Sequence, residues 1–409
     1  MDDSAVRAVL AGAFSHGPGK TLPLAAPPPP RPLIAGGVPL CALADGPFGA
    51  AVVRALRLAL APQRFEPWNA YNDHRAYPSP RAAFVVDVAV RAGAGRWHLD
   101  PVREWLFGAG DPPPPTVAVT LELTADPGRL PATYRSLAEA LAYLEAGHVA
   151  AALVEAAATQ GLAAECSTVD GVTTVSLTAG RTAYARPPAP ISRSAGIAPR
   201  GLTADPRPLP AATLPALLRA GTDPPPGSPA RRPGLRHAAA VRGVTGHPDG
   251  IYEAGPVLAG PVLAGPVLAG PVLAGPVLAG PVLAGPVLTA DGDVMPGVQE
   301  AFTYPPRSIA TAGMNVAWVM TAAVADAVRA DGPAAYHELL VAAGAAAQHI
   351  GTAAAELGLF CRPCRSVREA PLEALVSAPA AHDLLYLLLI GRSRVRDFAY
   401  DLTRPDIRP

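Results

Sequence analysis

Two alanine-rich segments carry the same hydrophobic pattern, although they lie far apart in the chain. Residues 144–162 read LEAGHVAAALVEAAATQGL, and residues 341–359 read VAAGAAAQHIGTAAAELGL. Both lack an internal proline and reach a glycine where a helix would end. A shift of 197 positions, the separation of Gly147 and Gly344, also superposes their alanine triplets and their final Gly-Leu pairs. We predict two related helices, whose many small residues favour close packing against other elements.

The patterns around these helices recur in the same order in both halves of the chain. The segment 84–101 reads as a strand, a glycine turn and an aromatic strand, and residues 237–254 repeat this pattern. The apolar run 384–390, LLYLLLI, predicts a further strand near the C-terminus. We therefore expect two fused, related halves. The other predicted elements are helices at 48–60 and 211–220 and strands at 83–90, 116–123 and 172–178.

Proline-rich stretches define the predicted domain borders. Residues 1–45 contain a PPPPRP run and are predicted to form a mobile tail with polyproline character. A PPAP segment at 187–190 separates a first domain, 46–186, from a second domain, 187–396. Residues 397–409 are expected to form a C-terminal tail.

Seven copies of AGPVL fill residues 254–288, inside the hairpin of the second half. Proline at every fifth position blocks a helix interior and a continuous strand ladder alike. A unit of five residues also has no supersecondary structure of its own to stack. We expect an elastin-like flexible loop without a function.

Composition and charge narrow the function classes. Hydrophobic residues make up 50% of the chain, which is enough for real cores. The 33 basic and 33 acidic residues cancel, and no basic stripe with interleaved aromatic residues is present, so we expect no nucleic acid partner. The acidic N-terminus is unlike a secretory signal, and LLYLLLI is far too short to span a bilayer. The expectation is a cytoplasmic protein without membrane association.

Two sets of residues near the paired helices could carry chemistry. Cys361 and Cys364 form a lone CxxC pair, and a zinc site would need a second pair, so we expect a structural role and no metal site. His148 follows Glu145 by one helical turn and could act as a general acid or base. It could equally pair with a local neighbour, and the second half has Ala345 at this place.

The C-terminal region also carries a cluster of arginines. Arg392, Arg394 and Arg396 follow the apolar run. They could hold a phosphate or carboxylate by forked hydrogen bonds, or they could form a solvated basic segment.

Several short motifs, taken in order, resemble the nitroreductase-like flavin superfamily and, within it, the SagB-type dehydrogenases of thiazole/oxazole-modified peptide pathways. No single motif is specific, and their order in two halves carries the resemblance. The motifs are Pro78-Ser79 before a strand, GRWHLDP at 95–101, LEAGH at 144–148, Arg193-Ser194, GIY at 250–252, Tyr336, Gln348 and Gly391-Arg392.

The resemblance implies an α+β fold with mixed or antiparallel sheets flanked by helices, in which the fused halves form an intramolecular pseudo-dimer. It implies FMN between the halves and oxidation of azoline rings of a ribosomal peptide to azoles. A modified peptide substrate and a cyclodehydratase partner follow from the same resemblance. The family is expected to use a Lys-Tyr pair, but Lys20 is the single lysine of the chain. Two alternatives stay open: a general nitroreductase-like NAD(P)H-dependent enzyme, and a peptide- or partner-binding scaffold without catalysis.

The resemblance also assigns site residues. Tyr336 and His148 are the candidate acid/base residues. The second half is expected to pass from a proline-rich linker at 223–233 to its strand without a loop like Pro78-Ser79, so that one flavin would bind per chain in one composite site. The implied cofactor-binding residues are Arg193, Ser194, Arg392 and Arg394 from the second half and Pro78 and Ser79 from the first.

Overall fold

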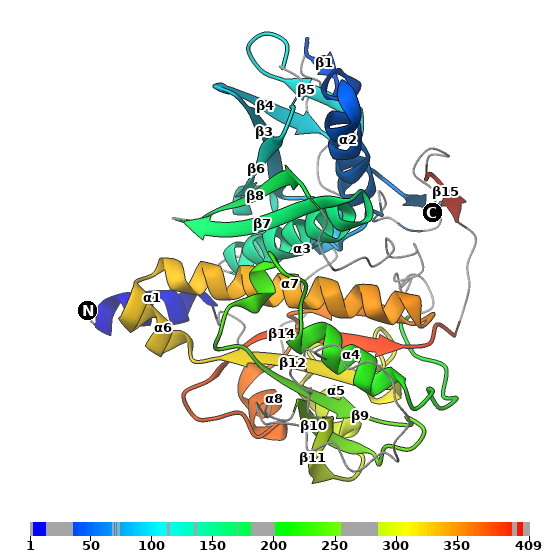
Figure 1. The fold of residues 1–409 in the computed structure, drawn as a ribbon. Helices are drawn as coiled ribbons and strands as arrows, with labels where there is room; N and C mark the ends of the chain where they lie inside the picture. Colours follow the sequence, from blue (N-terminus) through cyan, green and yellow to red (C-terminus); the bar gives the residue numbers. More distant parts are fainter. Residues whose placement is uncertain are drawn as a thin grey trace, which may run out of the picture.

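The protein, seen here as a computed structural model, is an α+β fold of two halves that lie one above the other in Figure 1. Each half contains an antiparallel sheet. Two helices of 23 residues, α3 (Leu137–Thr159) and α7 (Ala334–Glu356), lie between the sheets. The structure describes residues 3–13, 36–67, 69, 71, 74–112, 115–134, 137–169, 171–180, 201–254, 285–394 and 399–403.

The first half contains one seven-stranded sheet, and α2 (Gly46–Leu60) packs with α3 against one face of it. Strand β6 alternates between buried and more exposed residues, so the other face of the sheet meets solvent. The strands, in sheet order, are β1 (Val38–Pro39), β5 (Trp105–Phe107), β4 (Gly95–Asp100), β3 (Val86–Ala92), β6 (Ala118–Ala125), β8 (Val172–Ala179) and β7 (Leu162–Val169).

The second half contains a six-stranded sheet that is covered on both faces. Helices α4 (Thr213–Thr222), α6 (Val324–Asp331) and α7 pack on one face. Helices α5 (Met295–Ala301) and α8 (Glu369–Leu375) pack on the other. This explains the unbroken apolar run LLYLLLI, because a strand buried on both faces needs no polar positions. The strands, in sheet order, are β11 (Pro286–Asp291), β10 (Gly250–Ala254), β9 (Arg236–Val241), β12 (Val316–Ala322), β14 (Asp383–Gly391) and β13 (Phe360–Cys364).

The two sheets have the same strand order. From β5 to β7 the first sheet runs β5-β4-β3-β6-β8-β7, and the second runs β11-β10-β9-β12-β14-β13. Each strand of the second sheet has a number six higher than the strand at the same place in the first sheet. Helix α3 precedes β7 and β8 in the chain, and α7 precedes β13 and β14 in the same way. The prediction of two fused, related halves is therefore confirmed. Helices α5, α6 and α8 have no counterpart in the part of the first half that the structure describes.

Helices α3 and α7 pack side by side and run in the same direction. Residues of α3 and α7 that contact each other are separated in the chain by about 197 positions, to within about one helical turn, which is the separation found in the sequence. At the centre the backbones touch, because a Cβ at Gly147 would lie 2.0 Å from the Val341 oxygen and a Cβ at Gly344 would lie 2.0 Å from the Leu144 oxygen. The contacts that define this register join Glu139 with His337, Leu144 with Gly344, His148 with Gln348, Glu155 with His349 and Glu155 with Thr352.

Helix α3 is apolar and long enough to cross a membrane by length and composition alone. In the structure, however, 83% of its most apolar window is buried inside the protein. Its hydrophobicity is thus that of a core helix shared by two halves.

Both predicted tails contain ordered elements, which corrects the prediction for those residues. Helix α1 (Asp3–Ala13) packs on α6 and buries Val6, and β1 joins the first sheet, so that sheet begins before residue 46. Near the other end, β15 (Tyr400–Asp401) pairs with β2 (Arg64–Phe65) of the first half. Tyr400 lies 6.5 Å from the Phe65 ring, and this contact across the halves was not visible as a pattern in either short segment. The border predicted at 187–190 lies outside the described residues.

The AGPVL segment joins strand β10 to the edge strand β11. Ala254 of the first copy pairs with Pro286 of the last copy, where a proline is tolerated because β11 is an edge strand. The copies between them lie outside the described residues, so the predicted loop stays a prediction.

Deleting residues 255–279 removes five copies and leaves Gly280–Gly285 to connect the strands. Each halving of a loop changes its closure cost by only about 0.6 kcal/mol. We therefore expect the variant to fold, with a free energy of unfolding raised by about 1 kcal/mol, as measured by urea denaturation. A loss of stability would mean that the repeat packs on the body of the protein.

Candidate functional site between the two halves

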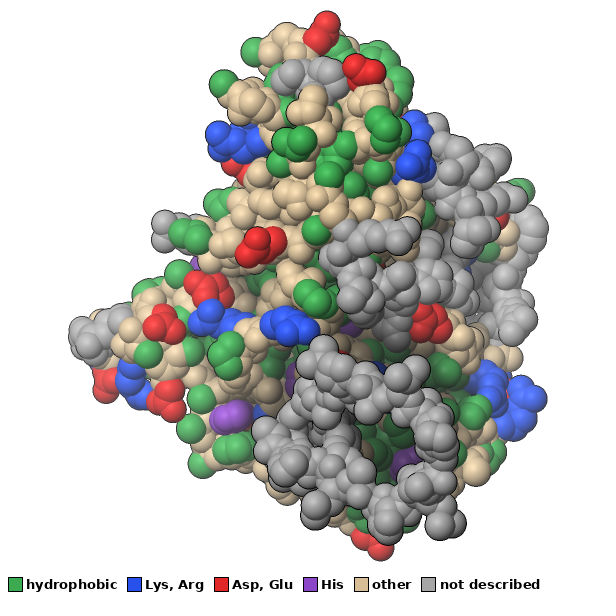
Figure 2. Space-filling view, in the orientation of Figure 1, with side chains coloured by type: hydrophobic (Ala, Val, Ile, Leu, Met, Phe, Trp, Pro, Cys, Tyr) green, Lys and Arg blue, Asp and Glu red, His purple; other side chains and the backbone are tan. Residues whose placement is uncertain are grey.

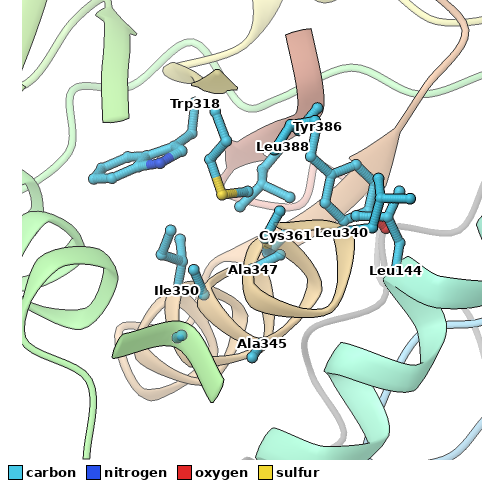
Figure 3. Packing of buried hydrophobic residues seen from close by; sticks show 14 of the residues in the cluster. Leu144, Trp318, Leu340, Ala345, Ala347, Ile350, Cys361, Tyr386 and Leu388 are labelled. Carbon is cyan, nitrogen blue, oxygen red and sulfur yellow. The ribbon is translucent and has the colours of Figure 1, made fainter. Parts of the chain in front are cut away.

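A chain of hydrogen bonds crosses the boundary between the halves beside α3 and α7. The His148 Nε2 atom lies 3.2 Å from the Tyr386 hydroxyl, and the His148 Nδ1 atom lies 3.1 Å from Gln348 Oε1. Gln348 Nε2 donates to the Ala76 oxygen at 2.9 Å. Figure 3 shows Tyr386 reaching from β14 to the boundary with α3, beside Leu144 and Leu340. Four segments from both halves are thus joined in one chain of hydrogen bonds, with the His148 imidazole at its centre.

The direction of this chain follows from its ends. Because Gln348 donates its amide N–H to Ala76, its oxygen is the atom that faces His148. Nδ1 must then carry the proton and donate to Gln348. In the neutral imidazole, Nε2 is then the acceptor for the Tyr386 O–H. His148 and Tyr386 are 1% and 6% exposed. The geometry therefore places a base, Nε2, against a buried phenol.

The loop that begins at Ser79 is held in a strained conformation next to this chain. Arg81, Ala82 and Phe84 all have positive φ angles, of 52°, 53° and 46°. Such angles are costly for residues other than glycine and often occur at functional sites. The Ser79 hydroxyl stabilises the loop, because it accepts from the Phe84 N–H at 2.7 Å and donates to Glu145 Oε2 at 2.6 Å.

Glu145 joins the loop to the helix that carries His148. It is 1% exposed, and burial raises the pKa of its carboxyl to about 7. The hydrogen bond from Ser79 and the charge of Arg75 act against this rise. A carboxyl that titrates near neutrality, fixed one turn from His148, gives the site a second group able to exchange protons.

Tyr336, predicted as an acid/base candidate, lies in the first turn of α7 and is 4% exposed. Burial raises the pKa of its phenol to about 12, although the Arg365 charge lowers it. Its hydroxyl has no hydrogen-bond partner among the described residues, and no described bond joins it to His148. The Arg365 charge also lowers the pKa of Tyr386, against the larger rise that burial causes. The two tyrosines thus share a cationic neighbour but not a hydrogen-bonded path.

The other predicted residues are placed as follows. Pro78 and Ser79 are half-buried and belong to the strained loop. Arg392 is half-buried and Arg394 is exposed, both just after β14. The Arg392 oxygen accepts from Asp205 N at 2.9 Å, so the chain around Asp205 runs beside it. Arg193 and Ser194 themselves lie outside the described residues.

Two of the described arginines have the chemistry that the phosphate of FMN needs. A flavin nucleotide needs cations for its phosphate and donors along the edge of its ring. Arg392 and Arg394 supply guanidinium groups at solvent-accessible positions, and the half-buried loop at 78–82 presents strained backbone. Ser79 contributes by holding this loop and not by a free hydroxyl, because both of its hydrogen bonds stay within the protein.

The CxxC pair is placed where it cannot act as a chelate or a disulfide couple. Cys361 and Cys364 lie three residues apart in strand β13, so their side chains leave opposite faces. Burial raises the pKa of the Cys364 thiol to about 11. Among the described residues, no group of three or more His, Cys, Asp or Glu side chains could hold a metal ion.

Two important residues, Tyr386 and Ser228, were not identified as candidates from the sequence. Tyr386 is hidden in an apolar strand, and only its position within LLYLLLI as the single polar residue could have marked it. Ser228 precedes the 3-10 helix η6 (Pro229–Arg231) and then β9, as Ser79 precedes the 3-10 helix η2 (Pro80–Ala82) and then β3. The expectation that the second half lacks such a loop was wrong, because its Ser-Pro pair is concealed within a proline-rich stretch.

Of the comparisons with known proteins, the one with solved structures finds a similar fold. No protein-family model matches the sequence, and no curated protein matches it. A candidate nitroreductase from Anabaena variabilis is similar in structure, with a TM-score of 0.69, 14% identity and coverage of 95% of this chain and 99% of that one. The Escherichia coli microcin synthetase McbBCD complex, with truncated pro-MccB17 bound, matches with a TM-score of 0.35 and 15% identity, over 50% of this chain and 71% of that one. An FMN-dependent nitroreductase from Clostridium difficile matches with a TM-score of 0.22 and 16% identity, over 27% of this chain and 62% of that one.

The match to the Anabaena protein extends over both halves, and its low sequence identity supports similarity of the fold only. It agrees with the repeated strand order and with the pairing of α3 and α7. The chain has a nitroreductase-like fold, with two such halves fused in one polypeptide.

Proposed function

We propose that the protein is an FMN-dependent oxidoreductase of the SagB type, which oxidises azoline rings of a ribosomally made peptide to azoles. The fold is that of flavin oxidoreductases, and the sequence motifs resemble the SagB branch. The observation that carries the proposal is the Tyr386–His148–Gln348 chain, a directed acid/base path at the boundary of the halves and beside a strained loop.

The cofactor would be held by residues of both halves. Arg392 and Arg394, with Arg193 and Ser194 of the same half, would neutralise the FMN phosphate by charge-assisted hydrogen bonds. The loop at Pro78 and Ser79 would meet the ring from the first half. When bound, FMN supplies the acceptor for the two electrons that azole formation removes from the substrate.

The residues of the chain would manage the proton. Aromatising an azoline removes a hydride and a proton from the ring carbons, and the proton needs a base. Tyr386 would accept it while passing its own proton to His148 Nε2, since Nδ1 is already protonated. Gln348 would keep this tautomer by accepting from Nδ1. A His-Tyr pair would then take the place of the Lys-Tyr pair that the resemblance leads one to expect.

A second candidate is a general nitroreductase-like enzyme that uses NAD(P)H to reduce a small acceptor. The lack of any lysine besides Lys20 favours it, since the expected azoline chemistry uses one. The two candidates share the fold, the cofactor and the cytoplasmic location that the sequence suggests, and they differ in substrate.

The purified protein is expected to be yellow and to release FMN on denaturation. Incubation with an azoline-containing peptide should then give azoles, detected by mass spectrometry as a loss of two hydrogens per ring. Turnover of NAD(P)H with a nitroaromatic or quinone, without azole formation, would instead select the second candidate. A protein that stays colourless after incubation with FMN would leave only the role of a peptide- or partner-binding scaffold.

A further inference from the structure

When two halves are related by an approximate two-fold axis, each position at the boundary between them has an equivalent position on the other side of the axis. Here the axis runs along the α3–α7 pair, because equivalent residues such as Glu155 and Thr352 face each other across it. His148 contacts Gln348 on one side of the pair. A shift of 197 positions turns this contact into Ala345 against Ala151 on the other side. The second side is therefore where a counterpart of the candidate site would lie.

The counterparts of the polar residues are all alanines. Glu145 corresponds to Ala342, His148 to Ala345 and Gln348 to Ala151. Each of the three alanines is 0% exposed. The second side thus has a packed apolar surface where the first has a carboxyl, an imidazole and an amide.

The loop before Ser228 in the second half also packs directly on strand β7 of the first half. Gly227 accepts a hydrogen bond from Cys166 N of β7 at 3.0 Å, and a Cβ on Gly227 would lie 1.9 Å from the Ala164 oxygen. Of the described non-glycine residues with positive φ, none belongs to η6, whereas two belong to η2. The turn at Ser228 is relaxed and seated on the first half.

A polar cluster, Ser228–His349–Glu155–Thr352, completes this closure. Ser228 Oγ lies 2.8 Å from His349 Nε2, and His349 Nδ1 lies 2.7 Å from Glu155 Oε1. Thr352 donates to the second Glu155 oxygen at 2.9 Å. The side chains of His349 and Glu155 are 1% and 5% exposed.

The order Ser-His-Glu has the spacing of a hydrolase triad, but the serine is not presented to a substrate. Ser228 is 5% exposed, and its oxygen already accepts the Ala230 N–H at 3.2 Å. A nucleophile needs an open approach and a free lone pair. The cluster instead bonds α3 of the first half to α7 and the Ser228 turn of the second.

We propose that the chain keeps one of the two ligand sites that its pseudo-symmetry would create, the one at Ser79. The other site has become a lock between the halves, made of the Ser228 turn and the cluster Ser228–His349–Glu155–Thr352. The binding part of this inference rests on the proposed FMN function, and the lock does not.

The test of the binding part is the FMN stoichiometry of the full chain, together with two matched variants. We expect one FMN per chain. Ser79→Ala should weaken FMN binding about tenfold, the loss expected when a hydrogen bond that holds the loop is removed. Ser228→Ala should leave FMN affinity unchanged. Two FMN per chain, or an equal loss of affinity in both variants, would overturn the single site while leaving the proposed function intact. No FMN at all would overturn the proposed function and the single ligand site with it.

The test of the lock is urea unfolding, which needs no flavin. His349→Ala leaves the Glu155 carboxyl buried without its imidazole partner, and breaking a buried pair is strongly destabilising. We expect the unfolding equilibrium constant to rise on the order of a hundredfold or more. Arg91→Ala, which removes an exposed ion pair with Glu122, is the control and should change it by less than about tenfold. Equal, small effects of both substitutions would show that the cluster does not hold the halves together.

Discussion

Gly344→Ala is expected to destabilise the protein by about 2 to 3 kcal/mol. Elsewhere in a helix, replacing glycine by alanine stabilises by roughly 1 kcal/mol. At this position the new Cβ would lie 2.0 Å from the Leu144 oxygen and 2.9 Å from the Leu144 carbonyl carbon, both of them backbone atoms. Backbone cannot rotate away, so α3 and α7 must move apart, and such overpacking outweighs the gain in helix propensity. Urea denaturation of the full chain measures the effect.

The matched control lies two turns further along the same helix. A Cβ at Gly351 would find its nearest neighbours, in Cys361, at 3.9 Å, which is ordinary contact. Gly351→Ala should therefore be neutral or stabilising by up to about 1 kcal/mol. If both substitutions stabilised equally, the helices would not touch backbone to backbone at Gly344. Gly147→Ala should repeat the loss, because its Cβ would meet the Val341 oxygen at 2.0 Å.

The same glycines explain why the fold could be predicted from the sequence. A helix that packs through its backbone can keep only small residues at the contact, and this constraint preserved a recognisable pattern in α3 and α7. The flanking strands followed because their turns and alternation are local signals. The added helices α5, α6 and α8 have no counterpart among the described residues of the first half, and comparing the halves could not reveal them.

The site was less predictable because its bonds join distant segments. His148 could be chosen as a candidate from its type alone, but its partners come from β14 and α7 of the other half. Tyr386 is an aromatic residue among leucines, and its hydroxyl is the one polar side-chain group of the run LLYLLLI. No local pattern identifies the partner of that hydroxyl. The turn at Ser228 was missed for a different reason, since proline-rich composition suggested a linker where the structure has a packed 3-10 helix. The pairing of β15 with β2 is fixed by tertiary contacts between two-residue strands, which carry no periodicity.

The surface agrees with the absence of a strong field in the sequence. Figure 2 shows acidic and basic side chains interspersed on the face it presents. The net charge of zero allows no long-range attraction of a polyanion. Binding of a peptide substrate would therefore depend on local contacts near the site.

Replacing His148 by alanine is expected to lower kcat for the proposed oxidation by about 10² to 10⁴-fold, the range for loss of a positioned acid/base group. Tyr386→Phe removes a single hydroxyl from the same hydrogen bond and should cost a similar factor. Because the two residues act as one path for the proton, the double variant should be little slower than either single variant. Bound FMN should stay constant in all three, and the pH dependence of kcat should change in all three, which a purely structural role would not produce. Effects that multiply in the double variant, or a loss of flavin that accounts for the loss of rate, would show that His148 and Tyr386 support the boundary between the halves and take no part in proton transfer.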